Sequence, residues 1–178
     1  MRQAAACTAP TIRLATRTDL PALTELAART FYDAFVATNT PENMEAYMST
    51  AFTVEQFTDE WEDVRATFYL AELDEHLVGY AKLFRPEPPD CVTERNAIEL
   101  SRLYVEQACH GHGVAPALLE HCFKAARREK FKAMFLGVWE HNPRAHAFYR
   151  KHGFARVGEH VFPMGDDPQI DWWMARPL

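Results

Sequence analysis

The stretch from Leu103 to Pro116 changes from one backbone type to another within a few residues, and it constrains the fold more than any other feature of the sequence. A β-rich run ends at Val105, a loop with Gly111 and Gly113 follows, and an amphipathic helix then begins. Such a junction brings free backbone N–H groups together with the positive end of a helix dipole. Both favour a bound anion, most often a phosphate. The junction therefore predicts an α/β protein that binds a phosphate-bearing cofactor.

The composition fits one globular domain. The chain has 178 residues, of which 48% are hydrophobic and 25% charged, enough for a full core. We expect residues 11–178 to form this domain and residues 1–10 to be a flexible segment. No apolar run is long enough to cross a membrane, and residues 1–7 lack the apolar stretch of a signal peptide. We therefore expect a cytoplasmic protein with no membrane partner.

Charge and cysteine usage disfavour further classes of protein. The formal net charge is -6, whereas a nucleic-acid-binding protein is more often basic, so we expect no nucleic-acid partner. An acidic surface attracts cations, which fits an amine substrate. The cysteines are scattered without a C-x-x-C pair and are interpreted as reduced thiols rather than as a disulfide or zinc framework. They are Cys7, Cys91, Cys109 and Cys122.

Hydrophobic periodicity predicts strands interleaved with helices, and hence a mixed α/β sheet layered by helices. Strands are predicted at 11–15, 68–73, 77–84, 97–105, 133–139, 154–162 and 170–175. Helices are predicted to begin at the capping residue Asp19, near Pro41, at the capping residue Thr53, at Val114 and at Asn142. Within 97–105, the alternation places Ile98, Leu100 and Arg102 against Glu99, Ser101 and Leu103.

Two nucleotide-binding loops are rivals for the glycine loop, and neither matches it. A dinucleotide-binding loop needs G-x-G-x-x-G early in the chain, but here Pro116 stands at the third glycine position and the loop comes late. A P-loop needs Gly-Lys-Ser/Thr, which is absent. The glycine loop is therefore still interpreted as a phosphate-binding loop, but one that belongs to neither of these two nucleotide-binding classes.

A second block, from Leu136 to Phe154, follows after one helix and one turn. It contains Asn142, Ala145, the pair Phe148-Tyr149 and the pair Gly153-Phe154. Together with His110-x-x-Gly113-x-Ala115, this block resembles the GNAT acetyltransferase superfamily over nearly the whole chain. The resemblance implies an acyl-CoA N-acyltransferase fold, in which a mixed, mostly antiparallel sheet splays at its middle and carries helices on both faces. Its implied cofactor is acetyl-CoA, as a co-substrate.

The resemblance also implies which residues bind acetyl-CoA. Leu103, Tyr104 and Val105 would pair through their backbone with the pantetheine arm, and the Val105 N–H would polarise the thioester carbonyl. The pyrophosphate would lie against the loop residues His110, Gly111, His112, Gly113, Val114 and Ala115. His110 stands where the family has Arg or Gln, which leaves its contribution open. Asn142 would contact pantetheine besides capping its helix. Lys151 either contacts the nucleotide end or is a solvated surface residue.

Two catalytic roles follow from the same resemblance. Tyr149 would be the general acid that protonates the departing CoA thiolate, the alternative being a packing tyrosine. Glu99 would be the base that removes a proton from the amine through water, the alternative being a salt bridge to Arg102 or Arg95. We expect no metal, since His110 and His112 have no further ligands readable from the sequence.

The acceptor is predicted less sharply than the cofactor. The segments 99–105 and 160–171 resemble the bacterial spermine/spermidine N-acetyltransferase (PaiA-like) branch, which implies a small primary amine such as a polyamine. A non-catalytic CoA-binding sensor and a protein N-acetyltransferase are the alternatives, and a homodimer is compatible with the sequence. Candidate acceptor contacts are Tyr32, Glu42, Glu45, Trp61, Asp166, Asp167 and Asp171.

Overall fold

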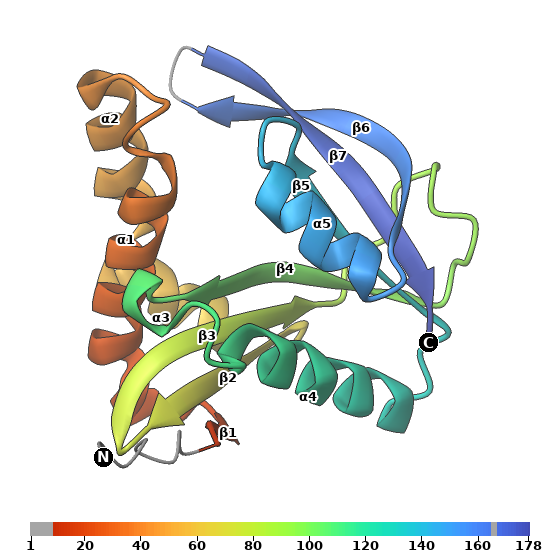
Figure 1. Ribbon diagram of the computed structural model, residues 1–178, viewed down its shortest axis with the longest axis horizontal. Helices are drawn as coiled ribbons and strands as arrows, with labels where there is room; N and C mark the ends of the chain where they lie inside the picture. The colour runs from red at the N-terminus through yellow and green to blue at the C-terminus, as the bar shows by residue number, and fades with distance from the viewer. Residues whose placement is uncertain (1–8, 165–166) are drawn as a thin grey trace, which may run out of the picture.

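The computed structural model describes residues 9–164 and 167–178 (Figure 1). Most of the predicted N-terminal segment 1–10, including Cys7, lies outside the described residues, and so does Asp166. No helix in the described ranges combines the length and the apolar character needed to cross a membrane.

The elements follow one another as predicted, with ends shifted by a few residues (Figure 1). The strands are β1 (Thr11–Leu14), β2 (Ala66–Leu73), β3 (His76–Phe84), β4 (Ala97–Val105), β5 (Ala133–Trp139), β6 (Ala155–Met164) and β7 (Asp167–Pro177). The helices are α1 (Leu20–Phe35), α2 (Pro41–Ala51), α3 (Val54–Glu62), α4 (Val114–Arg128) and α5 (Pro143–Lys151). Short 3₁₀ turns span Arg17–Asp19 and Gln107–Cys109.

Local capping explains where several helices begin. The Thr53 hydroxyl accepts a hydrogen bond from the Gln56 N–H at 3.1 Å, as predicted. Thr40 caps α2 in the same way, and a proline at the first helical position follows it. Asp19 precedes α1 as predicted, but its carboxylate bonds the Thr16 N–H and Arg13 instead of the first turn of α1.

The sheet has seven strands in the order β1-β2-β3-β4-β5-β7-β6. All neighbouring pairs of this sheet are antiparallel except β4 and β5, which are parallel. Ala97–Glu99 of β4 pair with 133–135 of β5, and the pairing stops there although both strands continue. The two strands therefore separate beyond Glu99, which confirms the predicted sheet that splays at its middle.

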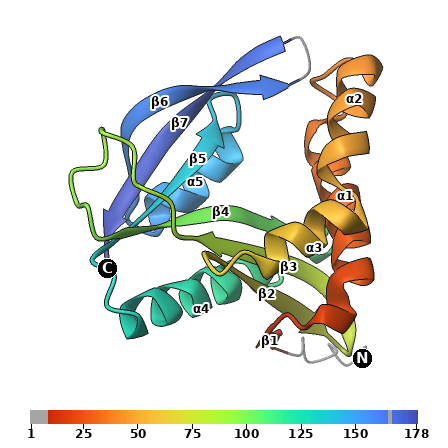
Figure 2. The same cartoon turned by 180° about the vertical axis from the view of Figure 1, so that it is seen from behind.

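Helices cover both faces of the sheet, as predicted (Figures 1 and 2). On one face α1 and α3 pack against β2 and β3, where Leu23, Phe57 and Tyr80 share a core. On the other face α4 and α5 cover a larger core around Leu118 and Met134. Each face of the sheet thus buries its own apolar layer.

A β-bulge at Ser101 changes which β4 side chains share a face. Lys82 of β3 pairs with Arg102, but the next residue, Leu83, pairs with Leu100, so Ser101 is the extra residue. The predicted uninterrupted alternation is therefore wrong from Ser101 onwards. Glu99 and Arg102 lie on the face of α1 and α3, whereas Leu100 packs with α4. The bulge is what brings Glu99 and Arg102 together.

We predict that Gly79→Ala destabilises the protein by about 1–3 kcal/mol, because an added Cβ overpacks a tight backbone approach. That Cβ would lie 2.9 Å from the Tyr104 carbonyl oxygen and 3.1 Å from Val105 Cγ2. Calorimetric melting should show the midpoint lowered by roughly 2–4 °C per kcal/mol. The control, Val64→Ala, changes a side chain that is 92% exposed and should melt like wild type. Equal melting of Gly79→Ala and wild type would contradict this packing.

Candidate active site

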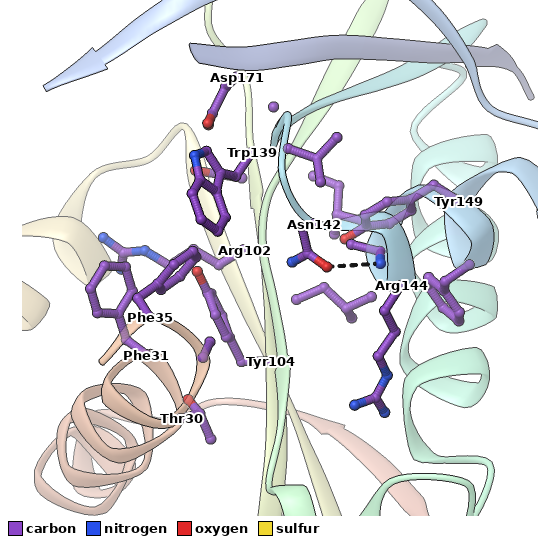
Figure 3. A pocket seen from close by; sticks show the side chains of 18 of the residues that line it. Thr30, Phe31, Phe35, Arg102, Tyr104, Trp139, Asn142, Arg144, Tyr149 and Asp171 are labelled. Carbon is purple, nitrogen blue, oxygen red and sulfur yellow. Dashed lines mark hydrogen bonds between the residues drawn. The ribbon is translucent and has the colours of Figure 1, made fainter. Parts of the chain in front are cut away.

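A cavity of about 620 Å³ opens where β4 and β5 separate (Figure 3). Its walls come from α1, α2, β4, α4, β5, α5, β6 and β7, so distant parts of the chain meet there. The predicted site residues that line it are Glu99, Leu103, Tyr104, Val105, His110, Ala115, Asn142 and Tyr149. The predicted residues that do not line it are Gly111, His112, Gly113, Val114 and Lys151.

The glycine loop has the backbone geometry of an anion cradle at the edge of this cavity. Gly111 and Gly113 have φ angles of 83° and 81°, the left-handed region that glycine adopts without strain. A Cβ at either position would meet no atom within 4 Å, so a ligand could approach closely. Within the described chain no acceptor is recorded for the N–H groups of these two glycines, Val114 or Ala115. Unbonded N–H groups at the start of α4 are the arrangement that favours a phosphate.

The His110 side chain turns back onto the end of β4 instead of pointing away from the loop. Its Nε2–H donates to the Val105 carbonyl oxygen at 2.9 Å. This bond ties the start of the glycine loop to the strand that precedes it. Through this hydrogen bond, His110 holds the glycine loop against the end of β4.

Asn142 and Tyr149 are positioned by α5 (Figure 3). The Asn142 Oδ1 accepts from the Ala145 N–H at 3.0 Å, which confirms the predicted cap and leaves its amide N–H₂ on the cavity side. The Tyr149 ring packs against Phe148 and Phe154, with ring centroids 5.2 Å and 5.6 Å away. Burial raises the pKa of Tyr149 above its usual range, so the hydroxyl stays protonated at neutral pH. Lys151 is exposed beyond the cavity, at the end of α5.

Glu99 lies at the point where β4 leaves β5 and faces the cavity. Burial raises the pKa of its carboxyl group, and the positive charges of Lys82 and Arg102 oppose that rise. The predicted alternative, a salt bridge to Arg95 or Arg102, is wrong in this structure. Arg95 pairs with Glu87 at 3.2 Å, and Arg102 pairs with Glu60.

Glu60 of α3 holds two cations beside the cavity, an arrangement that sequence reasoning missed. Both guanidinium N–H groups of Arg102 donate to its carboxylate, at 2.7 Å and 2.9 Å, and Lys82 Nζ donates at 2.7 Å. Burial opposes ionisation of Glu60, but the two cations outweigh it and hold the pKa of Glu60 below its usual range. These residues are 22 and 42 positions from Glu60, so no local pattern could reveal the contact.

Aromatic rings form the part of the cavity beside α1 and α2. Phe31 packs on Tyr47 with centroids 5.0 Å apart, Tyr47 meets Phe162 at 5.7 Å, and Phe35 meets Trp139 at 6.1 Å. Figure 3 shows Phe31 and Phe35 across from Asn142 and Tyr149. One side of the cavity thus carries the polar residues of α5, and the other carries rings suited to an apolar or cationic body.

The predicted acceptor contacts fall mostly outside this cavity. Tyr32 and Glu45 line a separate hollow of about 200 Å³, and Trp61 packs against the core under α1. Glu42 and Asp167 are exposed and line neither cavity. Asp171 does line the large cavity. The sequence therefore identified the acid on β7 but not the aromatic wall.

The splayed seven-strand sheet, with its glycine loop at the start of α4, matches the acyl-CoA N-acyltransferase fold expected from the sequence. Comparison with known proteins agrees. Residues 20–154 match the model of the Acetyltransferase (GNAT) family. An uncharacterized N-acetyltransferase of Lactobacillus delbrueckii subsp. lactis is 31% identical over 160 residues, which cover 90% of this chain and 92% of that relative.

Two solved structures illustrate the shared fold. The PaiA N-acetyltransferase from Thermoplasma acidophilum in complex with coenzyme A aligns with a TM-score of 0.74 at 20% identity, over 96% of this chain and 100% of that one. The ribosomal-protein-alanine N-acetyltransferase from Brucella melitensis aligns with a TM-score of 0.72 at 24% identity, over 94% and 99%. The chain belongs to the GNAT family and is an N-acetyltransferase.

We predict that Glu60→Ala lowers the free energy of unfolding by about 3–5 kcal/mol, because it leaves Lys82 and Arg102, whose side chains are only 10% and 18% exposed, without their anion. Denaturant titration at neutral pH measures this change. The matched control is Glu62→Ala, whose exposed ion pair with Arg17 at 3.5 Å should be worth less than about 1 kcal/mol. Similar losses in the two variants would contradict a special role for Glu60.

The same pair of variants tests the pH dependence of stability. The pKa of Glu60 is lower in the folded chain than in the unfolded chain. Its stabilisation is therefore complete above the unfolded value of about 4.3 and is lost as the pH falls through the folded value. As the pH is lowered from about 5 toward 1, Glu60→Ala should therefore lose less stability than wild type. If the free energy of unfolding fell equally steeply with pH for Glu60→Ala and for wild type, Glu60 would not be the group whose pKa is lowered by folding.

Proposed function

We propose that this chain transfers the acetyl group of acetyl-CoA directly to a primary amine of a small molecule, with polyamines such as spermidine as the first acceptors to test. The observation that carries the proposal is that Tyr149 and Glu99 line one cavity between the diverging strands β4 and β5.

Acetyl-CoA would enter along the free edge of β4. Beyond Glu99 this edge has no β5 partner, so the backbone groups of Leu103 to Val105 can pair with the amide groups of pantetheine. The unbonded N–H groups from Gly111 to Ala115 would bind the pyrophosphate, and Lys151 would approach the nucleotide end. The amide N–H₂ of Asn142 would donate to the pantetheine arm.

The transfer needs one base and one acid. The amine nitrogen attacks the thioester carbon, Glu99 takes the ammonium proton through water, and the Val105 N–H stabilises the developing oxyanion. The C–S bond then breaks, and the Tyr149 hydroxyl gives its proton to the CoA thiolate. The products are the amide and CoA thiol, and the proton held by Glu99 restores the Tyr149 hydroxyl through water. No acyl-enzyme is formed.

We predict CoA thiol release from acetyl-CoA with spermidine, and a weaker rate with single primary amines. The assay is a thiol-reactive dye across a panel of polyamines, alkyl monoamines and peptides with free N-termini. Turnover confined to the peptides would identify a protein N-acetyltransferase instead. Tight CoA binding by calorimetry without turnover on any acceptor would identify a CoA sensor.

We predict that Tyr149→Phe lowers kcat by about 10²–10⁴-fold, the usual contribution of a general acid, with little change in the Kd for acetyl-CoA. Rapid-mixing kinetics across pH 6–10 measures the effect. Phe148→Leu, which alters packing on the same helix without removing a proton donor, is the control. A kcat for Tyr149→Phe equal to that of wild type at every pH would remove Tyr149 from the acid role.

A further inference from the structure

Tyr104 belongs to the free edge of β4 through its backbone, but its side chain lies on the opposite face of the sheet from those of its two neighbours. Leu103 and Val105 pack against the core that α4 and α5 cover. The Tyr104 ring packs instead with the apolar clusters of α1, α2 and α3, and it lines the cavity. Tyr104 thus joins the strand edge proposed for acetyl-CoA to the aromatic side of the cavity.

Two rings from different elements hold the Tyr104 ring in place. Tyr80 of β3 pairs with Tyr104 across the strands and stacks on it, with centroids 5.8 Å apart and 18° between the planes. Phe31 of α1 packs against it with centroids 6.4 Å apart. Figure 3 shows the Tyr104 ring between Phe31 and Asn142, with its hydroxyl directed into the cavity. The hydroxyl therefore has a fixed place.

The hydroxyl groups of the two stacked tyrosines differ in access. The Tyr80 hydroxyl is fully buried and has no hydrogen-bond partner among the described residues. Tyr104 is only half-buried, and within residues 9–164 and 167–178 no hydrogen bond is recorded for its hydroxyl. Burial raises the pKa of Tyr104, so its hydroxyl stays protonated at neutral pH. It can then accept one hydrogen bond from a ligand and donate another.

The proposed reaction centre lies beside this hydroxyl. The Val105 N–H, which would stabilise the oxyanion, follows Tyr104 directly in the chain. Tyr149, the proposed acid, lies across the cavity on α5 (Figure 3). Burial raises the pKa of Tyr149, and the nearby Tyr104 adds to that rise. The amine would therefore approach from the aromatic side, where Tyr104 lies, and the thiolate would leave on the side of Tyr149.

Glu99 is poorly placed to hold the amine by itself. It shares a face of β4 with Tyr104 but lies five residues earlier, roughly 13–16 Å along an extended strand. Water can carry a proton over such a gap, but it does not fix the direction of the nitrogen lone pair. Arg102, between them on the strand, is a cation already bonded to Glu60 and does not attract an ammonium. Tyr104 is left to orient the nucleophile.

We propose that the Tyr104 hydroxyl binds the reacting amine and directs its lone pair toward the thioester carbon. The inference rests on the proposed function and adds a substrate-binding residue to it. An N–H of the amine, or of the ammonium before it loses its proton, donates to the Tyr104 oxygen. The Tyr104 O–H donates to the water that leads toward Glu99, and Tyr104 keeps its own proton throughout the transfer.

The test compares Tyr104→Phe with Tyr80→Phe, since each removes one hydroxyl from the same pair of stacked rings. The probe is spermidine, or the primary amine with the highest rate in the acceptor panel. Its Kd is measured by calorimetry on the complex with CoA, which has no acetyl group to transfer. For Tyr104→Phe we expect this Kd to weaken about 10- to 100-fold, because a hydrogen bond to a charged group is lost. The kcat/KM should fall at least as far, with the Kd for CoA unchanged.

Tyr80→Phe should leave the amine Kd and kcat/KM at their wild-type values, because its hydroxyl is sealed in the core. Melting temperatures show that both variants are folded. If Tyr104→Phe binds and acetylates the amine like wild type, or if both variants lose affinity equally, the inference is overturned while amine acetylation stands. A lower kcat with an unchanged amine Kd also overturns it. If the wild-type enzyme acetylates no amine, the proposed function falls and the inference with it.

Discussion

The short parallel contact between β4 and β5 is the constraint on which the site depends. Only the residues 97–99 and 133–135 are paired, and this contact joins the two halves of the sheet. Full pairing would have satisfied the backbone groups of β4 as far as Val105, and it would have closed the cavity. Because the contact ends at Glu99, the strand edge that follows is available to a ligand that can hydrogen-bond as a strand does.

The bulge at Ser101 has an equally specific consequence on the same strand. With regular alternation, Glu99 and Arg102 would lie on opposite faces of the sheet. The extra residue instead places both on the face of α3, where Glu60 pairs with Arg102 and Lys82. The two cations are therefore neutralised in part by Glu60, and their remaining charge acts on Glu99. A local irregularity of one strand thus sets the electrostatics around the proposed base.

The features that could be predicted from the sequence are local ones. The glycine loop, the Asn142 cap and most element boundaries depend on residues within a few positions of one another, and they agree with the structure. The Ser101 bulge depends on pairing with β3, which no pattern within β4 reveals. The aromatic wall joins Phe31, Tyr47 and Phe162, which are far apart in the chain. For the same reason Trp61, expected at the acceptor site, is found in the core instead.

The end of the cavity proposed for acetyl-CoA and the end proposed for the acceptor therefore differ in which parts of the chain form them. The cofactor end consists of two continuous segments, 103–115 and 142–149, whose backbone groups supply most of the contacts proposed for acetyl-CoA. Such contacts are made by the backbone and therefore tolerate many side chains. The acceptor end is made of single side chains from α1, α2, β5, β6 and β7, so one substitution there changes the chemistry of the wall. Similarity over most of the chain consequently identifies the acetyl transfer, whereas the identity of the amine would depend on the side chains of this wall.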